Sequence, residues 1–248
     1  MAVTAVALDS LPEIRPGDDL GQLIADGVEV RDDDVVVIAH KVVSKAEGRV
    51  RALAEVTPSA RARSLADELG KDDPRHVQVV LDETREIVRA SGGVLISLTH
   101  HGFICANAGV DRSNVPGEDR VVMLPVDPDG SARRLRARLG ELTGSRPAVL
   151  ITDSFGRAWR HGQTDVAIGC AGLEPLEDWR GRHDAAGREL SATWIAVADE
   201  LAAAADLART KDGRQPVVRV RGAGRHVTAE DGPGALALLR PAEQDLFR

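Results

Sequence analysis

VLISLTHHGFICANAGV, residues 94–110, is the stretch that decides the fold class. Two apolar segments in it are separated only by the polar kink Thr99-His100-His101, with no helix-length segment between them. Antiparallel strands can be joined by a short turn, whereas parallel neighbours need a long crossover, usually a helix. The stretch therefore predicts an antiparallel pair with both histidines in the turn. It favours an α+β fold with mixed, largely antiparallel sheets over a doubly wound parallel sheet.

Further strands and helices are expected on both sides of this stretch. Apolar, β-branched runs predict strands at residues 35–39, 77–81, 94–98, 121–124, 149–152 and 217–220. Helical patterns are expected at 59–69, where Ser59 is a candidate N-cap, at 131–142, and in the Ala/Leu-rich segment 193–208. The turn-rich segments 125–130 and 225–234 are too short for domain linkers, so residues 1–248 are expected to form a single domain.

Composition is that of a soluble globular protein with its own core. Of 248 residues, 43% are hydrophobic and 29% charged, and the formal net charge is −7. No apolar run reaches the ~20 residues of a membrane-spanning helix, and the N-terminal segment lacks the pattern of a signal peptide. A cytoplasmic protein without a membrane partner is expected. The acidic balance and the scarcity of aromatic residues (three Trp, three Phe, no Tyr) argue against nucleic acid as a partner.

The two cysteines, Cys105 and Cys170, lie far apart among small apolar residues. They are interpreted as buried thiols rather than as a disulfide or a pair of metal ligands.

The first candidate motif is VVSKAEGR, residues 42–49, which follows closely on an apolar strand. Strand ends are where open sheets hold ligands, and Lys45 offers a point charge for a phosphate. The alternative is a solvated loop after the strand. A Walker loop is excluded, because its pattern occurs nowhere in the chain.

The second motif is ANAGVDRSN, residues 106–114, whose small residues permit close approach of the backbone. Asp111 and Asn114 offer the hard oxygen atoms that magnesium or manganese prefers. A plain turn rich in Asp, Ser and Asn is the competing interpretation.

The third and strongest motif is ITDSFGRAWRHGQTD, residues 151–165. An apolar strand brings Asp153 and Ser154 to its end, where a carboxylate and a hydroxyl could hold a divalent cation on a nucleotide. Arg157 and Arg160 follow, and their guanidinium groups could bind phosphate or carboxylate. The alternative is that these arginines form structural ion pairs with Asp165.

Together these motifs resemble the coenzyme F-420:L-glutamate ligase family, also called F-420 gamma-glutamyl ligase. The resemblance also includes LPEI at residues 11–14 and GDDL at 17–20, and it covers most of the chain. It implies the single-domain form, without an additional flavin-binding domain, and an unusual α+β fold in an intertwined homodimer. It also implies a GTP-dependent, metal-dependent ligase that adds L-glutamate to the carboxylate of a deazaflavin precursor and extends a gamma-linked tail.

By matching positions, the resemblance implies three groups of site residues. The contacts to GTP would be Leu11, Pro12, Glu13, Ile14, His40, Lys45 and Asn114, completed by a later loop with Thr210, Lys211 and Gly213. The divalent metals, magnesium or manganese, would be held by Asp111, Asp153 and Ser154, and potassium is a further candidate cofactor. The sequence departs from the family pattern at Thr210-Lys211, where a more glycine-rich loop is usual.

The mechanism implied is activation of the carboxylate as an acyl phosphate, which the amine of glutamate then attacks. Lys45 would stabilise the phosphoryl oxygens, and Arg157 and Arg160 are hypothesised to grip the acidic substrates. Two alternatives stay open. One is a nucleotide- or deazaflavin-binding carrier without ligase activity, and the other is a ligase that joins an amino acid to another cofactor carboxylate.

Overall fold

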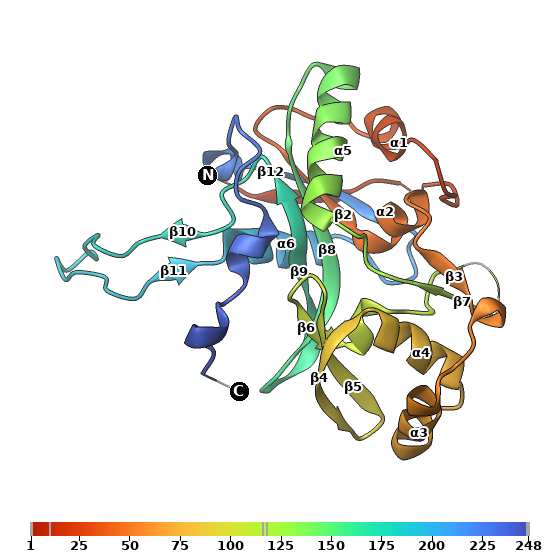
Figure 1. The fold of residues 1–248 in the computed structure, drawn as a ribbon. Coiled ribbons are helices and arrows are strands. Elements are labelled where there is room, and N and C mark those ends of the chain that lie inside the picture. Colours follow the sequence, from red (N-terminus) through yellow and green to blue (C-terminus); the bar gives the residue numbers. More distant parts are fainter. Residues whose placement is uncertain (1, 10, 116, 118, 247–248) are drawn as a thin grey trace.

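The largest element of the computed structural model, which describes residues 2–9, 11–115, 117 and 119–246, is a five-stranded sheet (Figure 1). Its strands, in spatial order, are β1 (Thr4–Ala7), β12 (Val217–Arg221), β2 (Val35–Ala39), β8 (Ala148–Arg157) and β9 (Arg160–Ala171). β2 and β8 are parallel, and the other neighbours are antiparallel. The pair β2–β8 lies at the centre and carries the site described below.

Helices cover both faces of this sheet. The β2 sequence VVVIA is buried at its first four positions, as expected for a strand with both faces covered. Val36 and Ile38 pack into a core closed by three helices, α1 (Leu20–Gly27), α2 (His40–Ala46) and α5 (Pro128–Thr143). Val35 and Val37 face the opposite core, closed by α6 (Val197–Asp206). The sheet is therefore the middle layer of three.

A smaller module lies at the lower right of Figure 1. It contains the helices α3 (Ala60–Leu69) and α4 (Pro74–Asp82), the antiparallel pair β3 (Val50–Ala52) and β7 (Arg120–Val122), and the antiparallel sheet β4 (Thr84–Ser91), β5 (Val94–Thr99) and β6 (Ile104–Ala106). Its own core includes Leu53, Val79, Leu95 and Val121.

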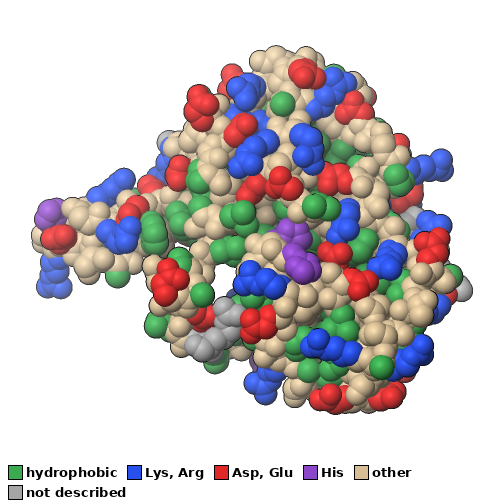
Figure 2. Space-filling model, in the orientation of Figure 1, with side chains coloured by type: hydrophobic (Ala, Val, Ile, Leu, Met, Phe, Trp, Pro, Cys, Tyr) green, Lys and Arg blue, Asp and Glu red, His purple; other side chains and the backbone are tan. Residues whose placement is uncertain are grey.

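A long arm leaves the body between β9 and α6 (Figure 1). It contains the short antiparallel pair β10 (Glu177–Asp178) and β11 (Trp194–Ile195). Hydrophobic side chains lie near its base and charged ones toward its end (Figure 2). The described 3-10 turns are Leu53–Glu55, Asn107–Gly109, Gly224–His226, Ala235–Leu238 and Ala242–Gln244.

The mixed α+β class and its largely antiparallel sheets are confirmed. β5 and β6 form the expected antiparallel pair, and His100 and His101 lie in the turn between them. Ser59 caps α3 by accepting a hydrogen bond from the backbone N–H of Ala62, and both cysteines are buried free thiols. Among the described residues, no helix is long and apolar enough to cross a membrane.

The strand expected at 77–81 is wrong, because this segment lies within α4. Asp73 accepts a hydrogen bond from the backbone N–H of Arg75, and Pro74 occupies the first turn, so the Asp-Pro pair starts a helix. Val77, Val79 and Val80 are buried on that helix. Tertiary burial here outweighs the β propensity of valine.

Three other boundaries differ from expectation. Segment 42–49 is not a loop: residues up to Ala46 belong to α2, which begins directly after β2 and buries Ser44 and Lys45. The turn-rich segment 125–130 contains the start of α5, where Asp127 is the N-cap. The segment 193–208 begins as strand β11, and its helix starts only at Val197.

Candidate functional site

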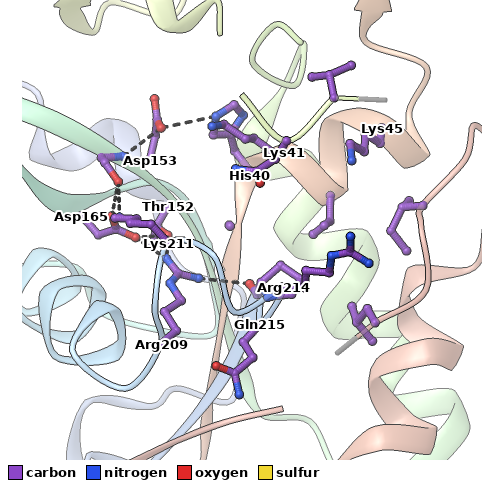
Figure 3. Close-up of a pocket in the computed structure, with 18 of the residues that line it drawn as sticks. His40, Lys41, Lys45, Thr152, Asp153, Asp165, Arg209, Lys211, Arg214 and Gln215 are labelled. Atoms are coloured by element: carbon purple, nitrogen blue, oxygen red, sulfur yellow. Dashed lines mark hydrogen bonds and ion pairs between the residues drawn. The ribbon is translucent and has the colours of Figure 1, made fainter. Parts of the chain in front are cut away.

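A cavity of about 490 Å³ opens beside the central parallel pair β2–β8 (Figure 3). It begins where the two strands end their pairing, at Ala39 and Thr152. Its other walls come from residues 11–14, α2, residues 114–115 and the loop 209–216. The carboxyl ends of parallel strands are a common ligand position in sheets covered by helices.

Positive charge predominates in this cavity. Three acidic side chains line it, Glu13, Asp153 and Asp165. Five basic ones line it, namely Lys41, Lys45, Arg209, Lys211 and Arg214. A cavity with this balance favours a polyanionic ligand such as a nucleotide triphosphate.

Helix α2 presents two residue pairs at the spacing of one helical turn, His40 with Ser44 and Lys41 with Lys45. His40 is 2% exposed, and its Nδ1 lies 3.4 Å from Ser44 Oγ. Lys45 is almost buried, and its Nζ donates to Glu13 Oε1 at 2.6 Å. The helix therefore aims an ammonium group into the cavity against the segment 11–14.

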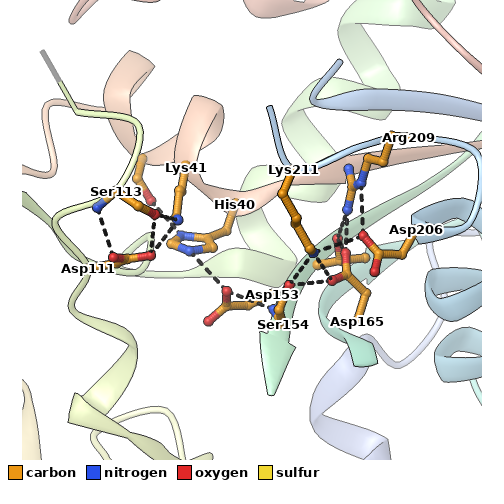
Figure 4. A network of polar contacts seen from close by, with 12 residues as sticks. His40, Lys41, Asp111, Ser113, Asp153, Ser154, Asp165, Asp206, Arg209 and Lys211 are labelled. Atoms are coloured by element: carbon orange, nitrogen blue, oxygen red, sulfur yellow. Dashed lines mark hydrogen bonds and ion pairs between the residues drawn. The ribbon is translucent and has the colours of Figure 1, made fainter. Parts of the chain in front are cut away.

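Lys41 reaches from the same helix to Asp111 (Figure 4). Its Nζ also donates to Ser113 Oγ at 2.6 Å, and the backbone N–H of Ser113 donates to Asp111 Oδ1 at 2.9 Å. Burial raises the pKa of the Asp111 carboxyl, but the hydrogen bonds from Lys41 and Ser113 and the charge of Lys41 together outweigh it and bring that pKa to about 2. Asp111 is therefore an ionised carboxylate beside the cavity.

Asp153 and Ser154 are consecutive residues of β8, so their side chains point to opposite sides of the strand. Asp153 Oδ1 lies 3.3 Å from Nε2 of His40, in a geometry that does not make a hydrogen bond. Ser154 points to the other side, toward Asp165 and Lys211 (Figure 4). The cavity thus has two clusters of polar side chains, one on each side of β8, just beyond Thr152, where the pairing of β8 with β2 ends.

The second group centres on Asp165 of β9, which is 2% exposed. It accepts hydrogen bonds from the hydroxyls of Thr152 and Ser154 and from the guanidinium of Arg209. Burial raises the pKa of Asp165, but the Ser154 hydroxyl and the Arg209 charge outweigh it, so the pKa lies below its ordinary value.

The side chains at this site include the types of oxygen ligand that divalent metals prefer. Asp111 and Asp153 supply carboxylates and Ser154 a hydroxyl, which are hard ligands suited to magnesium or manganese. Among the described residues, three or more His, Cys, Asp or Glu side chains do not gather as a closed metal cage. A magnesium ion bound with a nucleotide needs no such cage, because one or two carboxylates, water and phosphate oxygens complete its coordination.

Most of the residues predicted for the site share the cavity wall. These are Leu11, Pro12, Glu13, Ile14, His40, Lys45, Asn114, Asp153, Ser154, Thr210 and Lys211. Asp111 adjoins it through Lys41. Gly213 lies in the lining loop, where an added Cβ would come 2.7 Å from Thr210 Oγ1.

Arg157 and Arg160 lie elsewhere, at the exposed tip of the β8–β9 hairpin. Arg157 donates to the backbone oxygens of His161 and Gly162. Neither arginine lines the cavity or pairs with Asp165, whose ion-pair partners are Arg209 and Lys211.

Four charged cavity residues were not predicted for the site, namely Lys41, Asp165, Arg209 and Arg214, and of these Asp165 was considered only as the partner of a structural ion pair. Lys41 lies four residues before Lys45, so a helix here places both side chains on one face, and this spacing could have identified Lys41. Arg214 has a positive φ of 52°, a conformation uncommon for a side chain of this size and often found at functional sites. The pairing of Asp165 with Arg209 depends on tertiary structure and carries no local signal.

Comparison with known proteins identifies the family. The family model described as F420-0:Gamma-glutamyl ligase matches residues 9–222. The chain belongs to this family.

Three curated relatives are named coenzyme F420:L-glutamate ligase. The one from Methanothermobacter thermautotrophicus is 43% identical over 254 residues and covers all of both chains. Those from Methanopyrus kandleri and Haloarcula marismortui are 47% and 44% identical, over 95% and 98% of this chain and 94% of their own lengths. The protein is therefore an enzyme of the ligase class.

Proposed function

We propose that this ligase uses GTP to join L-glutamate to the carboxylate of a deazaflavin coenzyme F-420 precursor and then extends a gamma-linked glutamate tail. The observation that carries the proposal is the cationic cavity beside β2 and β8. It gathers the segment 11–14, α2, Asn114 and the loop 209–216 around Asp153 and Ser154. A mere binding module has little need for carboxylates placed among so many cationic groups.

GTP would lie along this cavity with its phosphates toward the basic side chains. Lys45 and Lys211 would contact phosphate oxygens, and His40 and Asn114 would bound the same space. The segment 11–14 and Thr210, with Gly213 shaping the loop, would form the remaining wall.

Asp111, Asp153 and Ser154 would hold magnesium or manganese, which when bound supplies positive charge against the phosphate oxygens. Lys41 now pairs with Asp111 and would have to move as that carboxylate becomes a ligand. A potassium ion is a further candidate at the same phosphates.

The chemistry begins with attack of the precursor carboxylate on the terminal phosphorus of GTP, which forms an acyl phosphate and releases GDP. The amine of glutamate then attacks the acyl carbon, the C–O bond to phosphate breaks, and phosphate and one proton leave. Lys45 stabilises the oxygens of the transferring phosphoryl group, because its ammonium is buried and already directed into the cavity. Arg157 and Arg160 would bind the carboxylates of the incoming substrates at the hairpin tip.

We also propose a cytoplasmic homodimer in which the arm packs against a second copy. A two-stranded ribbon is marginally stable alone. The arm ribbon leaves Trp194 half exposed, with the Arg180 guanidinium 4.1 Å from the centre of its ring. Two buried thiols that form no disulfide fit a reducing compartment. Light scattering of the full chain, and of a chain in which a short turn replaces residues 179–193, tests the dimer: the first should have twice the mass of the second.

The activity is tested by mass spectrometry of the deazaflavin precursor after incubation with the protein, GTP, L-glutamate and magnesium or manganese. Addition of glutamyl units that requires GTP and disappears in Asp153→Ala supports the proposal. Binding of GTP without any addition favours the carrier. Addition to a different cofactor carboxylate favours the related ligase.

A further inference from the structure

Ser154 and Asp165 face each other across the sheet. They are direct partners in the antiparallel register of β8 and β9, so their side chains share one face of the strand pair. Ser154 Oγ lies 2.6 Å from Asp165 Oδ1. Thr152 and Arg209 both contact the other oxygen, Oδ2.

The direction of the Ser154 hydrogen bond follows from the donors that surround it. An ammonium group only donates, so Ser154 Oγ accepts the hydrogen bond from Lys211 and has its own proton left for Asp165 Oδ1. Arg209, whose side chain is 8% exposed, donates to the other carboxylate oxygen of Asp165. Ser154 therefore donates its single hydroxyl proton to Asp165.

The lone pairs of Ser154 Oγ then face the cavity, where a cationic group already lies. Lys211 Nζ donates to Ser154 Oγ at 2.9 Å and to Asp206 Oδ1 at 3.0 Å, and it lies 3.6 Å from Asp165 Oδ1. The Lys211 side chain is 71% exposed, so little packing holds it there. The hydroxyl thus presents lone pairs, and not its proton, to a position that accepts positive charge.

We propose that Asp165 is the positioning residue that makes Ser154 a cation ligand, by holding the hydroxyl proton away from the cavity. This inference rests on the proposed function, in which Ser154 holds a divalent cation. Without the Asp165 carboxylate, the hydroxyl can rotate and turn its proton toward the cation. Partners that orient a metal ligand typically change metal affinity about 10–100-fold when they are lost.

The test is binding of manganese alone, followed by the electron paramagnetic resonance signal of the free ion. Asp165→Leu is combined with Arg209→Met. Replacing only one partner of a buried ion pair leaves the other charge buried and uncompensated, whereas replacing both with apolar residues is often neutral for stability. This double variant should bind manganese about 10–100-fold more weakly than the wild type, with an unchanged unfolding temperature.

A double-mutant cycle separates positioning from a general structural effect. Ser154→Ala should weaken manganese binding, and adding the Asp165→Leu/Arg209→Met pair to it should cause less than a threefold further loss, because Asp165 acts through Ser154. The matched control replaces another Asp–Arg pair, Asp34→Leu with Arg221→Met, in which a buried carboxylate directly before β2 pairs with a half-buried arginine of β12. It lies outside the cavity wall and should leave manganese affinity unchanged.

Three results would overturn the inference: wild-type affinity in the Asp165→Leu/Arg209→Met variant, independent and multiplicative losses in the cycle, or no manganese binding by the wild-type protein. Because the readout is manganese binding, it is separate from the test of the proposed function, which is the GTP-dependent addition of glutamate by the wild-type protein.

Discussion

Replacement of Lys45 by Met is the sharpest single test of the catalytic part of the account. An ammonium about 4 Å from a phosphate oxygen contributes about 4 kcal/mol at the effective dielectric constant of ~20 found near protein surfaces. Removal of one such group from a site where charge develops typically lowers kcat by about 10²–10³-fold. We expect a loss of that size in Lys45→Met, assayed by mass spectrometry of the glutamylated product with GTP and magnesium.

The same change should leave the fold intact. Met keeps the unbranched stem of Lys45, and the partner Glu13 is 53% exposed, so its carboxylate stays hydrated when the lysine is gone. Because Glu13 is exposed, the ion pair is screened by solvent and contributes about 0–1 kcal/mol, which corresponds to at most roughly 2–4 °C in unfolding temperature for a chain of this size. Lys71→Met, which removes an ammonium that bonds Asn107 outside the cavity wall, is the matched control. A Lys45→Met enzyme that turns over within threefold of the wild type would refute the role given to this lysine.

Three further predictions concern the substrates and the fold. Arg157→Ala or Arg160→Ala should raise the concentration of precursor or glutamate needed for half-maximal rate far more than it weakens GTP binding, and unchanged requirements would remove both residues from substrate binding. The hydrogen bond from Arg75 lowers the pKa of Asp73 to about 2 from 3.8, so its stabilisation is present above the higher value and is lost as pH falls through the lower one. Thermal unfolding between pH 5 and pH 2 should show a smaller decline in Asp73→Asn than in the wild type, and equal declines would contradict this assignment. Leu150→Ala, at a fully buried position of β8, should cost about 2–5 kcal/mol of unfolding free energy by denaturant titration, and a cost below about 1 kcal/mol would show that this site is not tightly packed.

The sequence predicts the elements that are decided locally. The antiparallel β5–β6 pair follows from a polar kink between two apolar runs, and α3 follows from the Ser59 cap. Local propensity fails at α4, because its valines read as a strand while the Asp73-Pro74 start and burial on one face make a helix. It also fails at α2, where a polar block turns out to be a helix with a buried serine and lysine.

The candidate site divides in the same way. Residues inside the three motifs, such as Asp153, Ser154 and Lys45, could be chosen from the sequence because residue type and spacing point to phosphate and metal chemistry. Arg209 and Asp165 could not be chosen in this way. Their contact joins the loop after α6 to β9, and it depends on the register of β8 and β9. The alternative interpretation of Arg157 and Arg160, as ion-pair partners of Asp165, rests on closeness in sequence, and the hairpin instead places both arginines at its tip.

The central claim is that GTP activates a substrate carboxylate in the cavity beside β2 and β8. The most direct test is to measure where the oxygen atoms of that carboxylate go during the reaction. The precursor is prepared with isotopically heavy oxygen in its carboxylate and incubated with the protein, GTP, L-glutamate and magnesium. Because the acyl phosphate bond breaks between carbon and oxygen, the account predicts one heavy oxygen in the phosphate released with the first glutamate, and none in GDP. Later additions activate unlabelled glutamyl carboxylates and release unlabelled phosphate. Formation of the glutamylated product without any labelled phosphate would contradict the account.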